Sequence, residues 1–363
     1  MAEITRDQVE AAIKGYIEPH LETDLVTAKS IKDIRIDGDK VAVDVLLGFP
    51  AKGIEGDIAA AVKAAVEGVD GVTGCDVGMD TKIVAHSVQK SLKPIDNVKN
   101  IIAVASGKGG VGKSTTAVNL ALALSVEGAR VGILDADIYG PSQPRMLGIS
   151  GKPESKDGNT LEPMMSYHLQ AMSIGFLIDE ETPMIWRGPM VTQALEQLLN
   201  DTNWDELDYL VIDLPPGTGD TQLTLAQKVP VSGAIIVTTP QDIALLDAKK
   251  ALKMFEKVEV PVLGIVENMA IHVCSNCGHA EHIFGSGGGA RMAEQYGVPL
   301  LGSLPLDIAI REQADGGTPT VAAQPDSESA GRYRLIARST AARLAQRARN
   351  KGFGLPKIVI QNT

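Results

Sequence analysis

The 363-residue chain has three cysteines, which are too few for the disulfide framework of a small secreted protein. No apolar run approaches the roughly 18 residues that span a bilayer, and the first residues lack the apolar core of a signal peptide. The chain also lacks a block of basic residues, and its formal net charge is −11. Since binding to nucleic acid requires clustered lysine and arginine, we expect no nucleic-acid partner. From the few cysteines and the lack of long apolar runs, we expect a cytoplasmic protein without a membrane partner.

The length exceeds that of one typical domain, and local patterns divide the chain unequally. Thr5 and Gln8 form a capping-box signal before a helix. Val41, Val43 and Val45 alternate with other residues, as in a strand with one buried face. The predicted organisation is a small α/β domain over residues 1–80, a linker over 81–98, a second domain over 99–349 and a tail over 350–363.

The second predicted domain alternates apolar strands with helical stretches, which is typical of an α/β fold with a mostly parallel sheet covered by helices on both faces. The strand candidates are Ile101–Ala105, Val131–Leu134, Tyr209–Ile212, Ala234–Thr238, Val262–Val266 and Leu300–Leu304. Residues 328–349 predict a closing helix. Because the carboxyl ends of parallel strands meet at one edge of the sheet, we expect the functional loops to gather there.

A glycine-rich G-x-x-x-x-G-K-S/T motif directly follows the first of these strands. It consists of Gly107, Lys108, Gly109, Gly110, Val111, Gly112, Lys113, Ser114 and Thr115. Small residues let the backbone wrap around phosphate oxygens, and the start of the following helix adds positive potential. The motif therefore predicts a P-loop NTPase that binds ATP, with Lys113 on the β- and γ-phosphates and the Ser114 hydroxyl on Mg²⁺.

A second lysine, Lys108, lies inside this loop, where most such loops carry a neutral residue. The stretch resembles the deviant Walker motif of the MinD/ParA/nitrogenase-iron-protein class. The resemblance implies a homodimer in which Lys108 reaches across the interface to the partner's nucleotide. There a cation would offset the charge that develops on the γ-phosphoryl group, as an arginine finger does. A solvent-exposed loop lysine is the plain alternative.

Aspartates end two further strand candidates. The apolar stretch that ends in Asp213 has the Walker B pattern, which predicts that this carboxylate holds Mg²⁺ through water. Asp135 and Asp137 form a D-x-D pair after another strand. In the resembled class the first aspartate helps to hold the magnesium shell and the second positions the attacking water. The resemblance therefore implies Asp135 as a magnesium residue and Asp137, with Lys108, as catalytic; a loop-capping role for Asp137 is the alternative.

Asn268 lies just past the strand candidate Val262–Val266. Its amide can both donate and accept hydrogen bonds, as the edge of an adenine requires. In the resembled class an asparagine at this position reads the base, which implies an ATP-binding role for Asn268. The stretch Leu304–Asp307 is expected to close the base pocket from the other side. An asparagine that makes a local turn is the alternative.

Cys274 and Cys277 form a C-x-x-C pair, which lets two thiolates converge on one metal. An iron–sulfur cluster requires four thiolates, and the third cysteine, Cys75, lies in the other predicted domain. A symmetric dimer would bring two pairs together around one bridging cluster, which we expect to be 4Fe-4S and labile. Zinc held by this pair with His279 and His282 is an alternative. A dithiol redox pair and two unliganded surface cysteines are the others.

The deviant loop and the cysteine pair together resemble the Mrp/ApbC family of iron–sulfur cluster carrier ATPases. The resemblance runs from about Lys99 to Arg349 and includes the stretches Asp135–Ser142, Trp186–Met190, Thr238–Gln241 and Val266–Met269. It implies a slow, switch-like ATP hydrolase that works as a homodimer and delivers a cluster to apo iron–sulfur proteins, with cluster assembly factors as further partners.

The first predicted domain resembles the small iron–sulfur-assembly-type domain that is often fused to such carriers. That domain commonly has a cysteine in the loop after its second strand, whereas residues 47–53 contain none. We therefore expect it to dock clients or assembly partners rather than to ligate a cluster. A positioning or partition-type ATPase with a structural zinc site is the main alternative for the whole chain, and an electron-donating ATPase is a third hypothesis.

Overall fold

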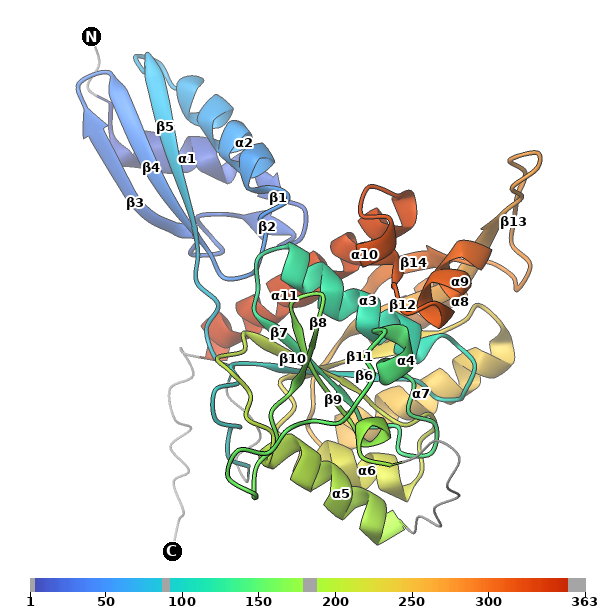
Figure 1. Cartoon of the computed structure of the whole chain (residues 1–363). Helices are drawn as coiled ribbons and strands as arrows, with labels where there is room; N and C mark the ends of the chain where they lie inside the picture. Colours follow the sequence, from blue (N-terminus) through green and yellow to red (C-terminus); the bar gives the residue numbers. More distant parts are fainter. Residues whose placement is uncertain (1–3, 87–91, 179–187, 352–363) are drawn as a thin grey trace, which may run out of the picture. The chain divides into compact units, whose positions relative to one another are not determined.

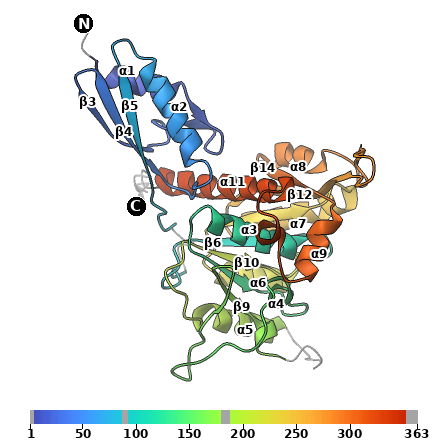
Figure 2. The ribbon, with the colours of Figure 1, turned by 45° about the horizontal axis from the view of Figure 1, so that its top comes forward.

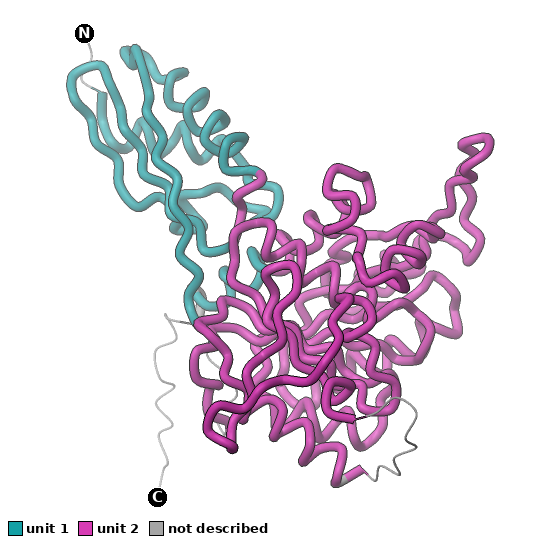
Figure 3. The backbone as a smooth tube through the Cα atoms, in the orientation of Figure 1, with its two compact units in different colours: residues 1–49, 54–86, 341–363 teal, residues 50–53, 87–340 magenta. Residues whose placement is uncertain are grey.

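The computed structural model describes residues 4–86, 92–178 and 188–351, and the chain divides into two compact units (Figure 3). Unit 1 comprises residues 1–49, 54–86 and 341–363, and unit 2 comprises residues 50–53 and 87–340. The predicted linker and tail lie partly outside the described residues, as does the start of the stretch Trp186–Met190. Within the described residues, no helix is both long enough and apolar enough to cross a membrane.

Unit 1 is built on a three-stranded sheet of order β3-β4-β5, in which β3 and β4 are antiparallel and β4 and β5 are parallel. Its elements are α1 (Arg6–Lys14), β1 (Ile17–Glu18), β2 (Thr23–Asp24), β3 (Ile31–Asp37), β4 (Lys40–Leu47), α2 (Glu55–Glu67) and β5 (Gly74–Thr81). The predicted capping box before α1 is confirmed, because the Thr5 and Gln8 side chains each accept a hydrogen bond from the other's backbone. Val41, Val43 and Val45 are buried, as their alternation predicts.

Unit 2 contains the remaining elements, and α11 continues beyond it. The strands are β6 (Ile101–Ala105), β7 (Val131–Asp135), β8 (Met164–Ser166), β9 (Leu169–Ser173), β10 (Tyr209–Asp213), β11 (Gly233–Thr238), β12 (Val262–Val273), β13 (Ala280–Glu281) and β14 (Leu300–Pro305). The helices are α3 (Lys113–Val126), α4 (Gln143–Met146), η1 (Ile174–Phe176), α5 (Gly188–Asn200), α6 (Asp220–Lys228), α7 (Asp242–Lys257), α8 (Gly288–Tyr296), α9 (Ile308–Asp315), α10 (Thr320–Ala323) and α11 (Glu328–Lys351).

The unit 2 sheet has the order β13-β12-β11-β6-β10-β7-β9-β8, and β14 pairs with β12. All pairings are parallel except those of the edge strands β8 and β13, so the predicted mostly parallel sheet is confirmed. Helices α3 and α11 cover one face, and α5, α6 and α7 cover the other (Figure 1, Figure 2). The two edge strands β8 and β13 and the parallel strand β9 lack a strong apolar pattern and were not predicted.

One strand prediction needs correction. The strand predicted over Val262–Val266 is β12, which continues to Val273, so Asn268 lies within the strand rather than past its end. Polar residues interrupt the apolar run here, but pairing with β14 and β13 extends the strand. Tertiary pairing therefore overrides the local signal, since strand formation depends on neighbouring strands more than on intrinsic propensity.

Candidate phosphate, magnesium and cysteine sites

The phosphate-binding loop joins the carboxyl end of the buried central strand β6 to α3. Gly110 and Gly112 have φ angles of +79° and +81°, a left-handed conformation that glycine adopts without strain. Gly112 is also the N-cap of α3 and makes no side-chain cap hydrogen bond. Because the first N–H groups of a helix have no partner inside the helix, the start of α3 offers donors and positive potential to an anion.

Replacement by alanine is expected to affect the stability of the protein differently at two glycines of this loop. A Cβ atom on Gly107 would lie 2.1 Å from the backbone carbonyl carbon of Asp247 in α7, whereas a Cβ atom on Gly109 would meet nothing within 4 Å. Gly107→Ala is therefore expected to destabilise the nucleotide-free protein by about 1–3 kcal/mol through overpacking. Gly109→Ala, the matched control, is expected to change stability by less than about 0.5 kcal/mol. Denaturant unfolding measures both, and equal stabilities would contradict the predicted packing.

The predicted magnesium residues come together at the carboxyl ends of β7 and β10 and the start of α3. Asp213 on β10 lies beside Asp135 on β7 in the strand register. Asp213 also forms an ion pair with Lys113, and the two side chains are 0% and 6% exposed. Lys113 Nζ lies 3.1 Å from the Ser114 hydroxyl oxygen. Gln143 Nε2 donates to Asp213 Oδ2 at 2.9 Å and to the Ser114 carbonyl at 3.1 Å, which ties the group together.

The Asp135 carboxylate is fully buried and strongly hydrogen bonded. Its Oδ2 accepts hydrogen bonds from the backbone N–H groups of Ser142 at 2.9 Å and Gln143 at 3.0 Å. Burial, followed by the charge of Asp213, raises the pKa of Asp135. Two neighbouring carboxylates in a buried site destabilise each other's ionised form, and a divalent cation beside them would remove that penalty.

Two side chains of this site, Gln143 and Ser173, were not predicted. Ser173 ends β9, and its hydroxyl donates to Asp135 Oδ2 at 3.2 Å. Gln143 directly follows the stretch Asp135–Ser142, so its position beside the D-x-D pair was the available signal. Ser173 gave no local signal, because only the pairing of β7 with β9 brings it to Asp135.

The two residues predicted as catalytic, Lys108 and Asp137, lie at the edges of this site. Asp137 follows β7, donates its backbone N–H to Asp135 Oδ1 at 3.1 Å, and has a pKa raised by burial. Lys108 is half-buried, and its ammonium forms no ion pair in the part of the chain that the structure describes. Its backbone carbonyl accepts a hydrogen bond from the Ser106 hydroxyl at 2.9 Å, which fixes the loop and leaves the side chain available.

Asn268 contacts the phosphate-binding loop directly. Its side chain is buried, and Nδ2 donates to the Val111 carbonyl at 2.9 Å. A Cβ atom on Gly112 would lie 2.1 Å from this nitrogen, so only glycine leaves room for the contact. The structure thus brings Asn268 to the loop, although the prediction from the resemblance concerned the base.

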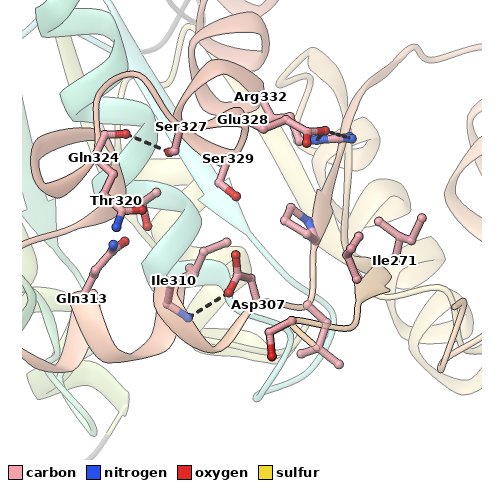
Figure 4. A pocket seen from close by; sticks show the side chains of 15 residues that line it. Ile271, Asp307, Ile310, Gln313, Thr320, Gln324, Ser327, Glu328, Ser329 and Arg332 are labelled. Atoms are coloured by element: carbon pink, nitrogen blue, oxygen red, sulfur yellow. Dashed lines mark hydrogen bonds and ion pairs between the residues drawn. The ribbon is translucent and has the colours of Figure 1, made fainter. Parts of the chain in front are cut away.

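A cavity of about 470 Å³ lies beside the end of β14, and Figure 4 shows residues of α9, α10 and α11 around it. Its lining includes Pro305, Leu306 and Asp307, which belong to the stretch expected to close a base pocket. Gln313 Oε1 and Thr320 Oγ1 are buried and have no hydrogen-bond partner among the described residues. The cavity therefore combines apolar walls with polar atoms that a ligand can satisfy.

The cysteine pair lies in the turn between β12 and β13, which Figure 1 shows extending from the rest of unit 2. The turn is closed by hydrogen bonds from Cys274 N to His279 O at 2.9 Å and from Gly278 N to Cys274 O at 2.8 Å. Backbone N–H groups of Asn276 and then Cys277 lower the pKa of the Cys274 thiol. Since the thiolate is the form that binds metal, the turn favours ligation by Cys274.

The other candidate ligands are less well arranged. Cys277 is exposed, and His282 Nδ1 is hydrogen bonded to the Ala270 carbonyl at 2.6 Å. Among the described residues, no three or more His, Cys, Asp or Glu side chains gather as a metal site. Cys75 lies on β5 in unit 1, where burial raises its pKa and favours the neutral thiol. The chain therefore offers one pair of thiols in unit 2, with Cys277 exposed and Cys274 half-buried.

The fold and the phosphate-binding loop define a P-loop NTPase of the MinD/ParA type. A solved MinD cell division ATPase from Pyrococcus furiosus has the same fold, with a TM-score of 0.50 and 23% identity over 66% of this chain and 97% of that chain. A solved nucleotide-binding protein from Archaeoglobus fulgidus, in complex with ADP, matches with a TM-score of 0.55 and 41% identity over 61% of this chain and 88% of that chain.

Sequence comparisons identify the family within this class of P-loop NTPases. Residues 97–341 match the family model described as NUBPL iron-transfer P-loop NTPase, and residues 6–77 match one described as iron–sulfur cluster assembly protein. An iron–sulfur cluster carrier protein of Pseudomonas fragi is 60% identical over 278 residues, covering 76% of this chain and 97% of the relative. One from Escherichia coli K12 is 51% identical over 343 residues, covering 94% and 93%. The chain belongs to the NUBPL iron-transfer P-loop NTPase family, and the predicted resemblance to cluster carrier ATPases is confirmed.

Proposed function

We propose that this protein is an ATP-binding and ATP-hydrolysing homodimer that carries an iron–sulfur cluster between its subunits and transfers it to apoproteins. The observation that carries the proposal is that unit 2 combines a phosphate-binding loop with a surface turn that holds a cysteine pair, of which Cys277 is exposed. Relatives over more than nine-tenths of the chain are named iron–sulfur cluster carrier proteins. The cluster is the cargo in this proposal, and ATP is the substrate of the switch.

Nucleotide binding replaces an internal ion pair. Lys113 and Asp213 contact each other in the buried site. To reach the β- and γ-phosphates, the Lys113 ammonium leaves Asp213, and the phosphate charge takes over as its partner. Asp213 is then free to accept a metal-bound water. The exchange leaves neither Lys113 nor Asp213 as an unpaired buried charge, which is the condition under which burying charge is tolerated.

The residues around Asp135 and Asp213 fit a hydrated Mg²⁺ ion. The donor set contains only hard oxygen ligands, as Mg²⁺ prefers. Ser142 Oγ and Gln143 Oε1 are buried nearby without a hydrogen-bond partner among the described residues, and the water shell of the ion would satisfy them. Ser114 would hold the ion through its hydroxyl oxygen, Asp137 would orient the attacking water, and the ion would supply charge neutralisation for phosphoryl transfer.

The base fits the cavity beside β14. A purine needs apolar walls and a few polar atoms, and the walls formed by Pro305 and Leu306 and the unpaired atoms of Gln313 and Thr320 supply both. Asn268 lies between the phosphate-binding loop and this cavity. Its side chain is beside Gly112 of the loop, and Ile271, further along β12, lines the cavity. This arrangement supports Asn268 as a nucleotide contact.

A cluster with four thiolate ligands requires two copies of the pair formed by Cys274 and Cys277. A two-fold dimer supplies them and places the cluster on its axis. The exposure of Cys277 makes such a cluster accessible to a recipient protein. Recipient apoproteins and assembly factors are the proposed partners, with unit 1 as the docking unit.

Replacing Lys108 with alanine tests the dimeric mechanism. If its free ammonium acts on the partner's nucleotide, Lys108→Ala is expected to slow ATP hydrolysis at least about tenfold. The affinity for ATP should change less than about threefold, because Lys113 remains. Steady-state phosphate release and equilibrium ATP titration measure the two effects. Lys152→Ala, which removes an exposed lysine elsewhere in unit 2, is the control, and hydrolysis at the wild-type rate in Lys108→Ala would contradict the interfacial role.

Anaerobic loading with iron and sulfide tests the proposal as a whole. About one 4Fe-4S cluster per dimer is expected from visible absorbance and from iron and sulfide counted per chain. A protein that takes up no cluster and instead contains one zinc ion per chain would overturn the carrier proposal. It would favour a switch ATPase whose cysteines are structural.

A further inference from the structure

Strand β12 consists of two pieces with an irregular joint between them. Its pairing with β14 shifts register between Glu267 and Ile271. Met269, inside this interval, has a φ angle of +56°, which is left-handed and uncommon for a residue with a long side chain. Backbone in such a conformation persists only where its surroundings hold it, and such positions cluster at functional and switching sites.

The first piece, which ends at Glu267, is fixed in the core. The Glu267 side chain is buried and accepts a hydrogen bond from the backbone N–H of Gly289, at the start of α8, at 2.6 Å. A Cβ atom on Gly289 would lie 3.0 Å from the Glu267 Cβ, so the helix and the strand are in close contact. Parallel pairing with β11 on the other side completes the support of this piece.

The second piece carries the cysteine turn and is held mainly by the chain after β14. Leu306 N donates to the Ile271 carbonyl at 2.8 Å, and His272 Nδ1 is hydrogen bonded to the Leu306 carbonyl at 3.0 Å. Since a carbonyl only accepts, His272 Nδ1 carries the proton. Ile271, Val273 and Ser275 line the 470 Å³ cavity, so this piece forms one wall of the proposed base site.

The joint itself contacts the phosphate-binding loop. Asn268 Nδ2 donates to the Val111 carbonyl at 2.9 Å. A Cβ atom on Gly112 would lie 2.1 Å from this nitrogen and 3.9 Å from Met269 Cε. No free space separates the loop from the joint, so a displacement of the loop by phosphate must move Asn268 and Met269 or be resisted by them.

We propose that Asn268 and Met269 are positioning residues that couple the nucleotide to the cysteine turn. The loop pushes on the joint, the first piece of β12 is fixed, and the second piece therefore turns about Met269 and carries Cys274 with it. Nucleotide occupancy then changes how firmly the two chains hold the cluster. This inference rests on the proposed carrier function and adds the residues through which ATP regulates it.

The test compares cluster release with and without nucleotide. Anaerobically loaded full-length protein is mixed with an iron chelator, and loss of visible absorbance is followed with and without a saturating, slowly hydrolysed ATP analogue. For wild type the two rates are expected to differ at least about fivefold, a usual size for allosteric coupling. In Met269→Gly the ratio is expected to fall below about twofold, because glycine adopts the left-handed conformation freely and no longer transmits the movement.

A second variant and a matched control complete the experiment. Asn268→Ala removes the contact with Val111 and is expected to lower the ratio as well, measured with the analogue at saturation for that variant. Glu259→Gly changes another left-handed residue, φ +58°, in the turn between α7 and β12, and is expected to keep the wild-type ratio. The coupling alone would be overturned if Met269→Gly kept the wild-type ratio of release rates, or if the analogue did not change the release rate of wild type. Wild type that holds no cluster would overturn the carrier function.

Discussion

Replacing Cys277 with alanine is expected to abolish the bound iron–sulfur cluster. A bridging 4Fe-4S cluster uses four thiolates, so the substitution removes two of the four ligands of a symmetric dimer. No other described cysteine lies in unit 2 apart from Cys274, so the chain has no replacement. Cluster content, measured as iron and sulfide per dimer after anaerobic loading, is expected to fall from about one cluster to none.

The same variant should keep its nucleotide site intact. Cys277 is exposed in a turn beyond the end of β12, so its truncation leaves no buried cavity and is expected to change stability by less than about 0.5 kcal/mol. ATP affinity should remain within about twofold of wild type. Cys75→Ala is the control, because that thiol lies in unit 1 and is not expected to bind the cluster. Wild-type cluster content in Cys277→Ala would refute the bridged model.

Replacing Lys113 with alanine is expected to abolish ATP binding. The Lys113 ammonium contacts Asp213 in the buried acidic site. Without it, the phosphates would meet the Asp135 and Asp213 carboxylates with no cation from the loop to offset their charge. The loss is expected to exceed 100-fold in affinity, about 2.7 kcal/mol at 25 °C, because charged hydrogen bonds to phosphate are the strong ones.

Thermal and denaturant unfolding separate this effect from misfolding. Mg-ATP at 100 times the dissociation constant is expected to stabilise wild type by about 2.7 kcal/mol and Lys113→Ala not at all. The nucleotide-free variant should also lose about 3 kcal/mol, because a buried carboxylate, Asp213, loses its ion-pair partner. Lys108→Ala is the control for charge within the loop and should keep the ATP-induced stabilisation. Equal stabilisation of both variants by ATP would contradict the assignment of Lys113.

The parts of the site that are local in sequence were predictable. The strand Ile101–Ala105 appears as predicted, and the two strands that end in Asp135 and Asp213 are each one residue longer than predicted. A continuous apolar run bounded by glycine or aspartate predicts a buried parallel strand. The carboxyl-end rule for parallel sheets then predicts that their loops share one edge. The order of β6, β10 and β7 as neighbours agrees with this expectation.

Contacts between distant residues were not predictable in the same way. Asn268 bonds to Val111 across 157 positions, and the strand containing it extends beyond its apolar run only because β13 and β14 pair with it. Ser173 reaches Asp135 because β9 pairs with β7, and the apolar pattern of β9 is too weak to predict a strand there. When a side chain reaches a site only through strand pairing, the local sequence pattern does not reveal its role.

The sequence alone predicts a glycine-rich loop for phosphate, aspartates after buried strands as a magnesium site and one C-x-x-C pair as ligands of a metal cargo. These depend on residue type and short spacing, which a local stretch of chain contains in full. The contact of Gly112 with Asn268 and the left-handed backbone at Met269 could be seen only in the tertiary structure, because they arise where β12 packs against the loop. Packing between segments far apart in the chain is a property of the whole fold, so no local pattern encodes it.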